Sequence, residues 1–353
     1  MKLICGPMAT LSHEAFRYCI ENFGACDEYF TEMINAASLL TMGPFEKYYL
    51  MNEVAPQKMV WQLTSNDGEK LSQAATLLAQ KGGIGIDINM ACCAPQIYKT
   101  GAGISWMLKD LKITRNAVAS TKKSLQDYEN KTGKHLRLSV KCRLGDENFT
   151  ENSFFNFTDM LIQEGVELIT LHPRTLKEKY RLEPKYEFLK KLCDRYKNHK
   201  NQIQIYANGN IKDTNSAKKI ISLCPEISGL MISRAAAQKP WIFNQIKYEL
   251  ENSESKNLEN PQNLKNQNES GAKKLHKIDR MECALNFIDD LQKYQPEEFY
   301  KTRIQRFFEL YCEQFQFGHY FKTQMQNYHS LEESKQKVQD YFSRQANERF
   351  LYY

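Results

Sequence analysis

The chain has 353 residues, of which 42% are apolar and 25% are charged, and its formal net charge is +6. These values lie near globular averages and exclude a fibrous or wholly disordered protein. No apolar run approaches the roughly 20 residues that span a bilayer, and the opening residues lack a secretory signal, so we expect a cytoplasmic protein without membrane contact.

Short β-rich runs alternate with helix-like segments from the N-terminus to about residue 245. Helix-like segments such as 68–83, 116–134 and 154–165 separate the runs, and the last two end at Gly or at Thr-Gly. The eight runs are 3–8, 29–33, 59–64, 84–90, 136–142, 168–173, 202–209 and 229–234. This alternation implies parallel pairing, and eight repeats predict an α/β fold, a (β/α)8 TIM barrel over residues 1–250.

The C-terminal part has a different pattern. Residues 251–270 are poor in apolar residues and predict a polar linker. Apolar residues then recur at helical spacing, as in Ile304, Phe307, Phe308 and Tyr311, which predicts a small all-helical domain over 271–353. Its further aromatic residues are expected mostly in the core, although they also suit a surface for stacking bases: Phe315, Phe317, Tyr320, Phe321 and Tyr328.

Ten cysteines are scattered along the chain, without a C-x-x-C pair or zinc-finger spacing. We therefore expect no metal site. In a reducing compartment most of these cysteines are expected to be small buried apolar residues. Cys92 and Cys93 are the exceptions, because they directly follow a strand that ends in polar residues.

Polar or special residues stand at the carboxyl ends of the eight predicted strands, where barrel enzymes carry their chemistry. Glycine and a cation follow the last two strands, at Asn208-Gly209 and Ser233-Arg234, which favours a phosphate site. No G-x-G-x-x-G follows a strand, so a Rossmann nicotinamide site has no support. Flavin mononucleotide (FMN) fits better, because Lys141 near the ring would stabilise the anionic reduced flavin.

The joint order of these motifs resembles the tRNA-dihydrouridine synthases. The resemblance rests on GPMATLSHEAFR (6–17), TEM (31–33), QL (62–63), GIDINMACCAPQIYKTGAG (85–103), VKCRLG (140–145), LHPRT (171–175), ANGNI (207–211) and MISRAAAQKPWIF (231–243). It implies an FMN enzyme that uses NADPH or NADH to reduce the C5–C6 double bond of chosen uridines in tRNA. The implied flavin contacts are Pro7, Met8, Gln62, Lys141, His172, Asn208, Gly209, Ser233 and Arg234. The implied residues around the uracil are Asn89, Cys92, Lys141, Arg143 and His172.

The substrate's electronics require hydride addition at C6 and proton delivery to C5 from the opposite side. A thiol is a suitable acid, since a cysteine with a pKa of about 8.5 is largely protonated at neutral pH. The family segment commonly reads Asn-Met-Gly-Cys-Pro, and alignment on Asn89-Met90 places Cys92 at the cysteine and Cys93 at the proline. We expect Cys92 to be the acid, while Cys93, or neither thiol, stays an alternative.

The chain departs from the family pattern at other positions. Gln96 stands where lysine is usual, Asn210 where aspartate is usual, and Ser233 where glycine is usual. We expect the Ser233 hydroxyl to bind the cofactor phosphate. The predicted helical domain is nearly neutral, with thirteen Lys/Arg against twelve Asp/Glu over 271–353, so an RNA contact requires a local patch or the more basic barrel. Lys301, Arg303 and Arg306 are candidates, and an ordinary solvated helix face is an equally good interpretation.

Two other functions stay open. One is an FMN barrel oxidoreductase that acts on a free pyrimidine or another small molecule, which turnover without tRNA would support. The other is a non-catalytic RNA-binding barrel, which a colourless purified protein would support. A tRNA-sized partner makes a monomer the expected state.

Overall fold

The computed structural model describes residues 1–199, 203–258 and 276–353. The chain divides into two compact units. The first comprises Met1–His13, Cys26–Lys212 and Ser216–Ser233, and the second comprises Glu14–Ala25, Asp213–Asn215 and Arg234–Tyr353. Residues 14–25 and 234–250, which the sequence pattern assigns to the barrel, therefore group with the second unit. In the predicted linker, residues 251–258 end a helix and residues 259–270 lie outside the described residues.

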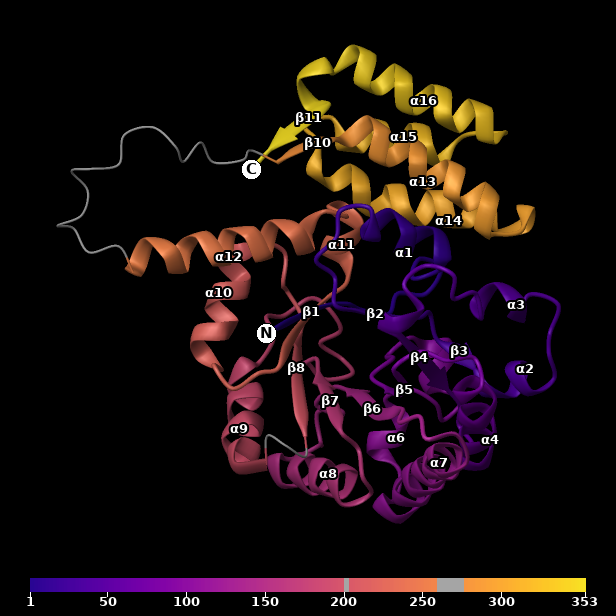
Figure 1. The fold of residues 1–353 in the computed structure, drawn as a ribbon, viewed down its shortest axis with the longest axis vertical. Helices are drawn as coiled ribbons and strands as arrows, with labels where there is room; N and C mark the ends of the chain where they lie inside the picture. The colour runs from indigo at the N-terminus through magenta and orange to yellow at the C-terminus, as the bar shows by residue number, and fades with distance from the viewer. Residues whose placement is uncertain (200–202, 259–275) are drawn as a thin grey trace. The chain divides into compact units, whose positions relative to one another are not determined.

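A closed barrel of parallel strands forms the centre of the first unit (Figure 1). Each strand pairs with its neighbours in the order β1, β2, β4, β5, β6, β7, β8, β9, and β9 pairs back with β1. The strands are β1 Lys2–Cys5, β2 Glu28–Phe30, β4 Met59–Thr64, β5 Gly85–Met90, β6 Arg137–Cys142, β7 Leu168–Leu171, β8 Gln204–Asn208 and β9 Gly229–Ile232. The short β3, Ile34–Asn35, adds to β4 outside the ring. The predicted (β/α)8 barrel is confirmed, and all eight predicted runs contain a strand.

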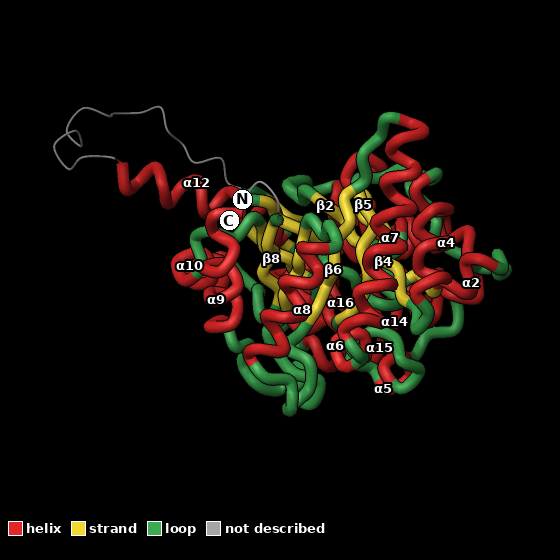
Figure 2. Tube along the Cα trace, turned by 90° about the horizontal axis from the view of Figure 1, so that it is seen from below, coloured by secondary structure: helices red, strands yellow, loops and turns green. Residues whose placement is uncertain are grey.

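Helices connect successive strands, and α4, α7, α8 and α9 lie around the outside of the strands (Figure 2). Local signals set several boundaries: Asp67 caps α4 by accepting from the backbone N–H groups of Glu69 and Lys70, and Gly133 ends α7 at a φ of 69°. The helices of this part of the chain are α2 Ala36–Leu40, α3 Glu46–Tyr49, η1 Pro56–Lys58, α4 Gly68–Ala79, α5 Pro95–Tyr98, α6 Ser105–Leu108, α7 Leu111–Thr132, α8 Glu151–Gln163, α9 Tyr186–Tyr196, η2 Lys197–His199 and α10 Thr214–Leu223.

Strand register decides which side chains face the barrel interior. Successive side chains of a strand point to opposite faces, and residues paired across neighbouring strands share a face. On β6 the residues Arg137, Ser139 and Lys141 therefore face inward, in register with Gly85, Asp87 and Asn89 of β5. The intervening Leu138, Val140 and Cys142 face the surrounding helices.

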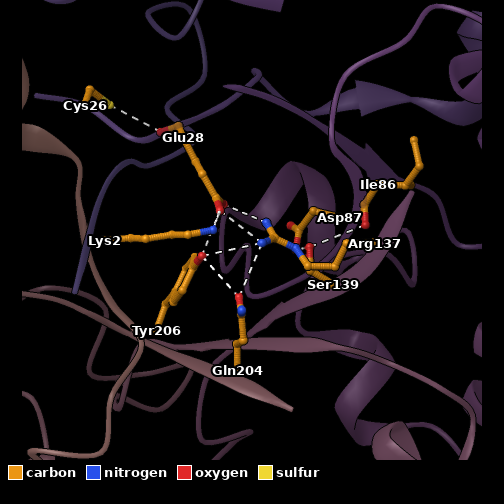
Figure 3. Close-up of polar contacts among 9 residues, drawn as sticks. All are labelled: Lys2, Cys26, Glu28, Ile86, Asp87, Arg137, Ser139, Gln204 and Tyr206. Carbon is orange, nitrogen blue, oxygen red and sulfur yellow. Dashed lines mark hydrogen bonds and ion pairs between the residues drawn. The ribbon is translucent and has the colours of Figure 1, made fainter. Parts of the chain in front are cut away.

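The barrel interior contains an apolar cluster and several hydrogen-bonded polar side chains. Six fully buried residues from six strands form the apolar cluster: Ile4, Phe30, Val60, Leu168, Tyr206 and Met231. Polar side chains of β1, β2, β5, β6 and β8 make hydrogen bonds in the same interior (Figure 3). At the strand starts, the Glu28 carboxylate accepts from Arg137 at 2.6 Å, Lys2 at 2.7 Å and the Tyr206 hydroxyl at 2.9 Å. Burial raises the pKa of Glu28, but Arg137 and Lys2 outweigh burial, and the net shift is downward.

The second unit is mainly helical. Its elements are α1 Glu14–Glu21, α11 Arg234–Gln238, α12 Ile242–Leu258, β10 Lys277–Asp279, α13 Arg280–Tyr294, α14 Glu297–Tyr311, η4 Cys312–Gln314, α15 Gly318–Gln326, α16 Leu331–Arg344, η5 Ala346–Glu348 and β11 Phe350–Tyr352. The antiparallel pair of β10 and β11 is an addition to the predicted all-helical region. The sequence pattern misses it because each strand has three residues and the two lie about seventy residues apart.

Stacked aromatic rings fill the core of the second unit. The Phe287 and Phe307 ring centroids are 3.8 Å apart, and those of Phe321 and Tyr341 are 4.1 Å apart. Of the aromatic residues singled out in the sequence, Phe315, Phe321 and Tyr328 are buried, whereas Phe317 and Tyr320 are exposed. The core interpretation therefore holds for three of the five. None of the described helices has the length and apolar character needed to cross a membrane.

Candidate active site

Most of the predicted site residues lie on one face of one barrel. Gln62, Asn89, Lys141 and Asn208 are the inward-facing residues near the ends of their strands, as the strand register shows. Pro7, Met8, Cys92, Arg143, His172, Gly209 and Ser233 follow within three residues of a strand end. Because all eight strands run parallel, these ends share one mouth. Arg234 is an exposed residue that begins α11 and belongs to the second unit.

Three buried side chains, Asp87, Gln62 and Asn89, form a hydrogen-bonded chain below the mouth, which we call the amide network. Gln62 Nε2 donates to Asp87 Oδ2 at 2.7 Å, and Asn89 Nδ2 donates to Gln62 Oε1 at 2.8 Å. Asn89 Oδ1 in turn accepts from the backbone N–H groups of Ala91 at 3.1 Å and Cys92 at 2.9 Å. The network thus holds the turn that carries the predicted acid.

The two adjacent thiols differ in exposure. Cys93 is 7% exposed, whereas Cys92 is only partly buried. Burial raises the pKa of the Cys92 thiol, and this effect outweighs the Ala94 N–H and the charges of Lys141 and Arg143, which lower it. The Cys92 thiol is therefore protonated at neutral pH, while the charges of Lys141 and Arg143 favour its thiolate form.

A glycine closes the turn from its other side. The Ile104 N–H donates to the carbonyl oxygen of Cys92 at 3.1 Å. Gly103, the residue before Ile104, has a φ of 60°, and a Cβ at this position would come within 2.5 Å of the Cys92 carbonyl oxygen. Only glycine allows this approach of the two backbone segments.

Lys141 and Arg143 place two cations near the turn. Burial, followed by the Arg143 charge, lowers the pKa of Lys141 to about 8, although Asp87 opposes the shift. Arg143 donates through Nε to the Ala91 carbonyl at 3.0 Å and through a terminal nitrogen to the Lys179 carbonyl at 3.1 Å. Arg143 therefore ties the Cys92 turn to the segment after β7, a structural role that its sequence motif does not show.

His172 is held by Arg174, which is not among the implied flavin and uracil contacts. An Arg174 terminal N–H lies 3.0 Å from His172 Nε2, and Arg174 also donates to Leu182 O and, at 3.0 Å, to Asn210 Oδ1. Because a guanidinium only donates, Nε2 accepts, and Nδ1 of a neutral His172 ring carries the proton. The LHPRT motif contains Arg174, but its contact with His172 requires the fold.

The loops after β8 and β1 make close backbone contacts. Gly209 has a φ of 115°, and a Cβ there would come within 2.9 Å of His172. Asn208 Nδ2 donates to the Met231 carbonyl at 2.8 Å. A Cβ on Gly6 would come within 2.4 Å of the Ser233 hydroxyl oxygen, so Ser233 packs directly against this backbone. The two glycines therefore allow the backbone to lie this close to the side chains of Ser233 and His172.

Other features do not extend this site. A cavity of about 380 Å³ is lined by residues that include Met107, Lys109, Asp146 and Phe149, and none of the predicted site residues is among them. Within the described ranges, no group of three or more His, Cys, Asp or Glu side chains is arranged to hold a metal ion.

Comparison with known proteins gives consistent matches. The family model described as Dihydrouridine synthase (Dus) matches residues 3–347. A probable tRNA-dihydrouridine synthase of Aquifex aeolicus (strain VF5) is 29% identical over 250 residues, covering 70% of this chain and 72% of that protein. The tRNA-dihydrouridine synthase B of Pseudomonas putida is 25% identical over 252 residues, covering 71% and 69%. Among solved structures, morphinone reductase in complex with tetrahydroNAD aligns with a TM-score of 0.46 and 10% identity over 70% of this chain and 86% of that chain.

Proposed function

We propose that this chain, which belongs to the dihydrouridine synthase family, is a flavin-dependent oxidoreductase that reduces the C5–C6 double bond of specific uridines in tRNA. FMN is the proposed bound cofactor, and NADPH or NADH is the proposed reductant. The observation that carries this proposal is the partly exposed Cys92 thiol, whose turn is fixed by Asn89 on the same barrel face as Lys141.

The residues at the mouth fit FMN. Gly209 allows the backbone to approach His172 closely, and the Ser233 hydroxyl and Asn208 are the polar groups proposed for the phosphate end. Gln62 and Lys141, near the ends of β4 and β6, are the proposed contacts of the ring, together with Pro7 and Met8 after β1. Arg234 is proposed from its place next to Ser233 in the sequence alone. When bound and reduced, FMN supplies a hydride to C6 of the uracil.

The protein's own part in the reaction is to hold the uracil and supply a proton. As C6 gains the hydride, the electron pair of the double bond moves toward the C4 carbonyl oxygen, which becomes an enolate oxygen. Asn89, Arg143 and His172 are the proposed partners of the uracil and stabilise this charge. The Cys92 S–H bond then breaks, its proton forms the new bond to C5, and the thiolate takes a proton from water. A raised pKa keeps this acid protonated beforehand.

The second unit is the proposed site of tRNA contact. Lys301 is exposed, but Arg303 is buried with its guanidinium 4.8 Å from the Phe299 ring centroid, and Arg306 pairs with Glu309. Arg303 therefore does not belong to an exposed basic face. Exposed Phe317 and Tyr320 provide rings on which bases can stack.

The test measures dihydrouridine by mass spectrometry in tRNA from cells that lack the protein, complemented with the wild type, Cys92→Ala or Cys93→Ala. We expect one or more dihydrouridines to disappear with the gene and to return with the wild type and Cys93→Ala. Cys92→Ala should reduce the rate about 100-fold or more, the usual contribution of a general acid.

If no dihydrouridine changes and no other enzyme modifies the same position, the proposal is wrong. Turnover of a free pyrimidine without tRNA would then support the small-molecule alternative. Activity that survives in Cys92→Ala but not in Cys93→Ala would instead move the acid to the second thiol.

A further inference from the structure

Asp87 is a fully buried carboxylate that the proposed chemistry does not use. It lies on the inner face of β5, two residues before Asn89, and is 0% exposed. Gln62 Nε2 donates to its Oδ2 and the Ser139 hydroxyl donates to its Oδ1, each at 2.7 Å. Both of these hydrogen-bond donors are neutral, so the cost of burying the carboxylate calls for an explanation.

The direction of the hydrogen bonds supplies one. A carboxylate oxygen accepts from Gln62, so the amide nitrogen of Gln62 faces Asp87 and its oxygen faces Asn89. The Asn89 nitrogen must then donate to that oxygen, which leaves the Asn89 oxygen toward the backbone. There it meets two N–H groups, of Ala91 and Cys92. Reversing either amide would set two acceptors or two donors against each other.

We propose that Asp87 is a positioning residue that fixes the orientation of the Gln62 and Asn89 amides and thereby the backbone of the Cys92 turn. Its effect on the reaction rests on the proposed function, because Cys92 is the acid and Asn89 a uracil contact only there. Its effect on the turn rests on the hydrogen bonds alone. Ser139 is a suitable control, since it contacts the other carboxylate oxygen and lies outside the amide network.

The experiment measures backbone amide hydrogen exchange by mass spectrometry in the full chain, comparing wild type, Asp87→Ala, Asp87→Asn and Ser139→Ala. Asp87→Ala should accelerate exchange in peptides covering 89–94 by about tenfold, as expected for loss of one hydrogen bond. Peptides covering β8 and β9 should be unchanged. Asp87→Asn should stay within about twofold of wild type, because the Asn oxygen still accepts from Gln62 while its nitrogen donates to Ser139. Ser139→Ala should also leave residues 89–94 unchanged.

A second variant guards against a failure of Asp87→Ala to fold. Gln62→Met removes the middle of the amide network at similar volume and should accelerate exchange at the same residues. Three outcomes would each overturn the proposal. The variants could exchange residues 89–94 at the wild-type rate, the acceleration could be equally large in β8 and β9, or Asp87→Asn could behave like Asp87→Ala.

A functional measurement separates the two proposals. With saturating FMN, Asp87→Ala should form dihydrouridine at least about tenfold more slowly, and Asp87→Asn should restore most of the rate. If the wild type forms no dihydrouridine, the proposed function fails, but the exchange pattern still decides whether Asp87 positions the turn. If the wild type is active and Asp87→Ala matches it, the positioning role in catalysis is refuted.

Discussion

Two buried carboxylates, Glu28 and Asp87, face the same barrel interior (Figure 3), but the pKa of Glu28 is lowered and that of Asp87 is raised. Glu28, at the start of β2, accepts from two cations and a hydroxyl, and these cations hold its pKa below the ordinary value. Asp87, nearer the mouth, accepts from an amide and a hydroxyl, and burial raises its pKa to about 6. The hydrogen bonds from Ser139 and Gln62 and the charges of Lys141 and Arg137 offset only part of that cost.

The two carboxylates differ because the strand starts stabilise the barrel, whereas the strand ends carry the candidate site. At the strand starts, the buried Glu28 carboxylate pairs with Arg137 and with the exposed Lys2, and these ion pairs join β1, β2 and β6. Near the strand ends, a buried charge is kept beside neutral donors because it orients groups at the mouth. Local rules of stability are usually broken at functional sites, and Asp87 fits that pattern.

Removal of the Glu28 charge should have the largest effect on stability. Glu28→Gln leaves Arg137 without its carboxylate partner, so the free energy of unfolding at pH 7 should fall by about 3–5 kcal/mol. Urea denaturation measures it, and Lys2→Met is the control, since the exposed Lys2 should contribute less than about 1 kcal/mol. The pKa of Glu28 is lower in the folded state than its unfolded value of 4.5, so the ionised carboxylate stabilises the folded state above pH 4.5. This stabilisation is lost as the pH falls through the folded-state pKa. The difference in unfolding free energy between wild type and Glu28→Gln should therefore shrink below pH 4.5. A loss under about 1 kcal/mol at pH 7 would contradict the comparison.

Asp87→Asn should act with the opposite sign. A raised folded-state pKa favours folding at low pH, and this contribution is lost as pH rises from 3.8 to about 6. At 1.36 kcal/mol per pH unit, the variant should gain up to about 3 kcal/mol over wild type between pH 4 and pH 7. The attraction between Asp87 and Lys141 is already part of this net shift and does not change the expected gain. Denaturation of both proteins across this range tests it, and a variant that is less stable at pH 7 would show that Asp87 is stabilising.

Tyr206→Phe should have the smallest effect. It removes the hydroxyl that donates to Glu28 at 2.9 Å but keeps the ring in the apolar cluster. A hydrogen bond to a charged group contributes about 1.5–3 kcal/mol, and the remaining donors to Glu28 should limit the loss to the lower end. The same denaturation series measures it. A loss as large as that of Glu28→Gln would mean that the hydroxyl, rather than the cations, stabilises this carboxylate.

The sequence alone predicts the barrel because strand and helix periods alternate clearly and end at recognisable residues. It also brings Gln62, Asn89, Lys141 and Asn208 to one mouth, since all of them lie at or near the carboxyl ends of parallel strands. It does not reveal the partner of Asp87. The alternation in IGIDINM places Asp87 on the same face as Asn89, but Gln62 lies 25 residues away, and only the pairing of β4 with β5 brings the two together.

Other differences have the same origin in tertiary structure. Arg143 and Arg174 both stand in recognisable motifs. The contact of Arg143 with Ala91 joins segments that follow different strands, and the contact of Arg174 with His172 depends on the path of the loop after β7. Residues 14–25 follow β1 as a barrel helix would, so sequence order cannot show that they group with the second unit.

The alternation along β6 has a consequence for how the chain tolerates change. Arg137, Ser139 and Lys141 point into the barrel interior at the start, the middle and the end of the strand. Leu138, Val140 and Cys142 alternate with them and are buried on the other face. Insertion or deletion of one residue within this strand would exchange the two sets along the rest of its length. A single such change after Arg137 would then displace both the Ser139 hydroxyl on Asp87 and the Lys141 cation at the mouth. Changes in chain length are therefore expected in the loops on either side of β6, and not within its six residues.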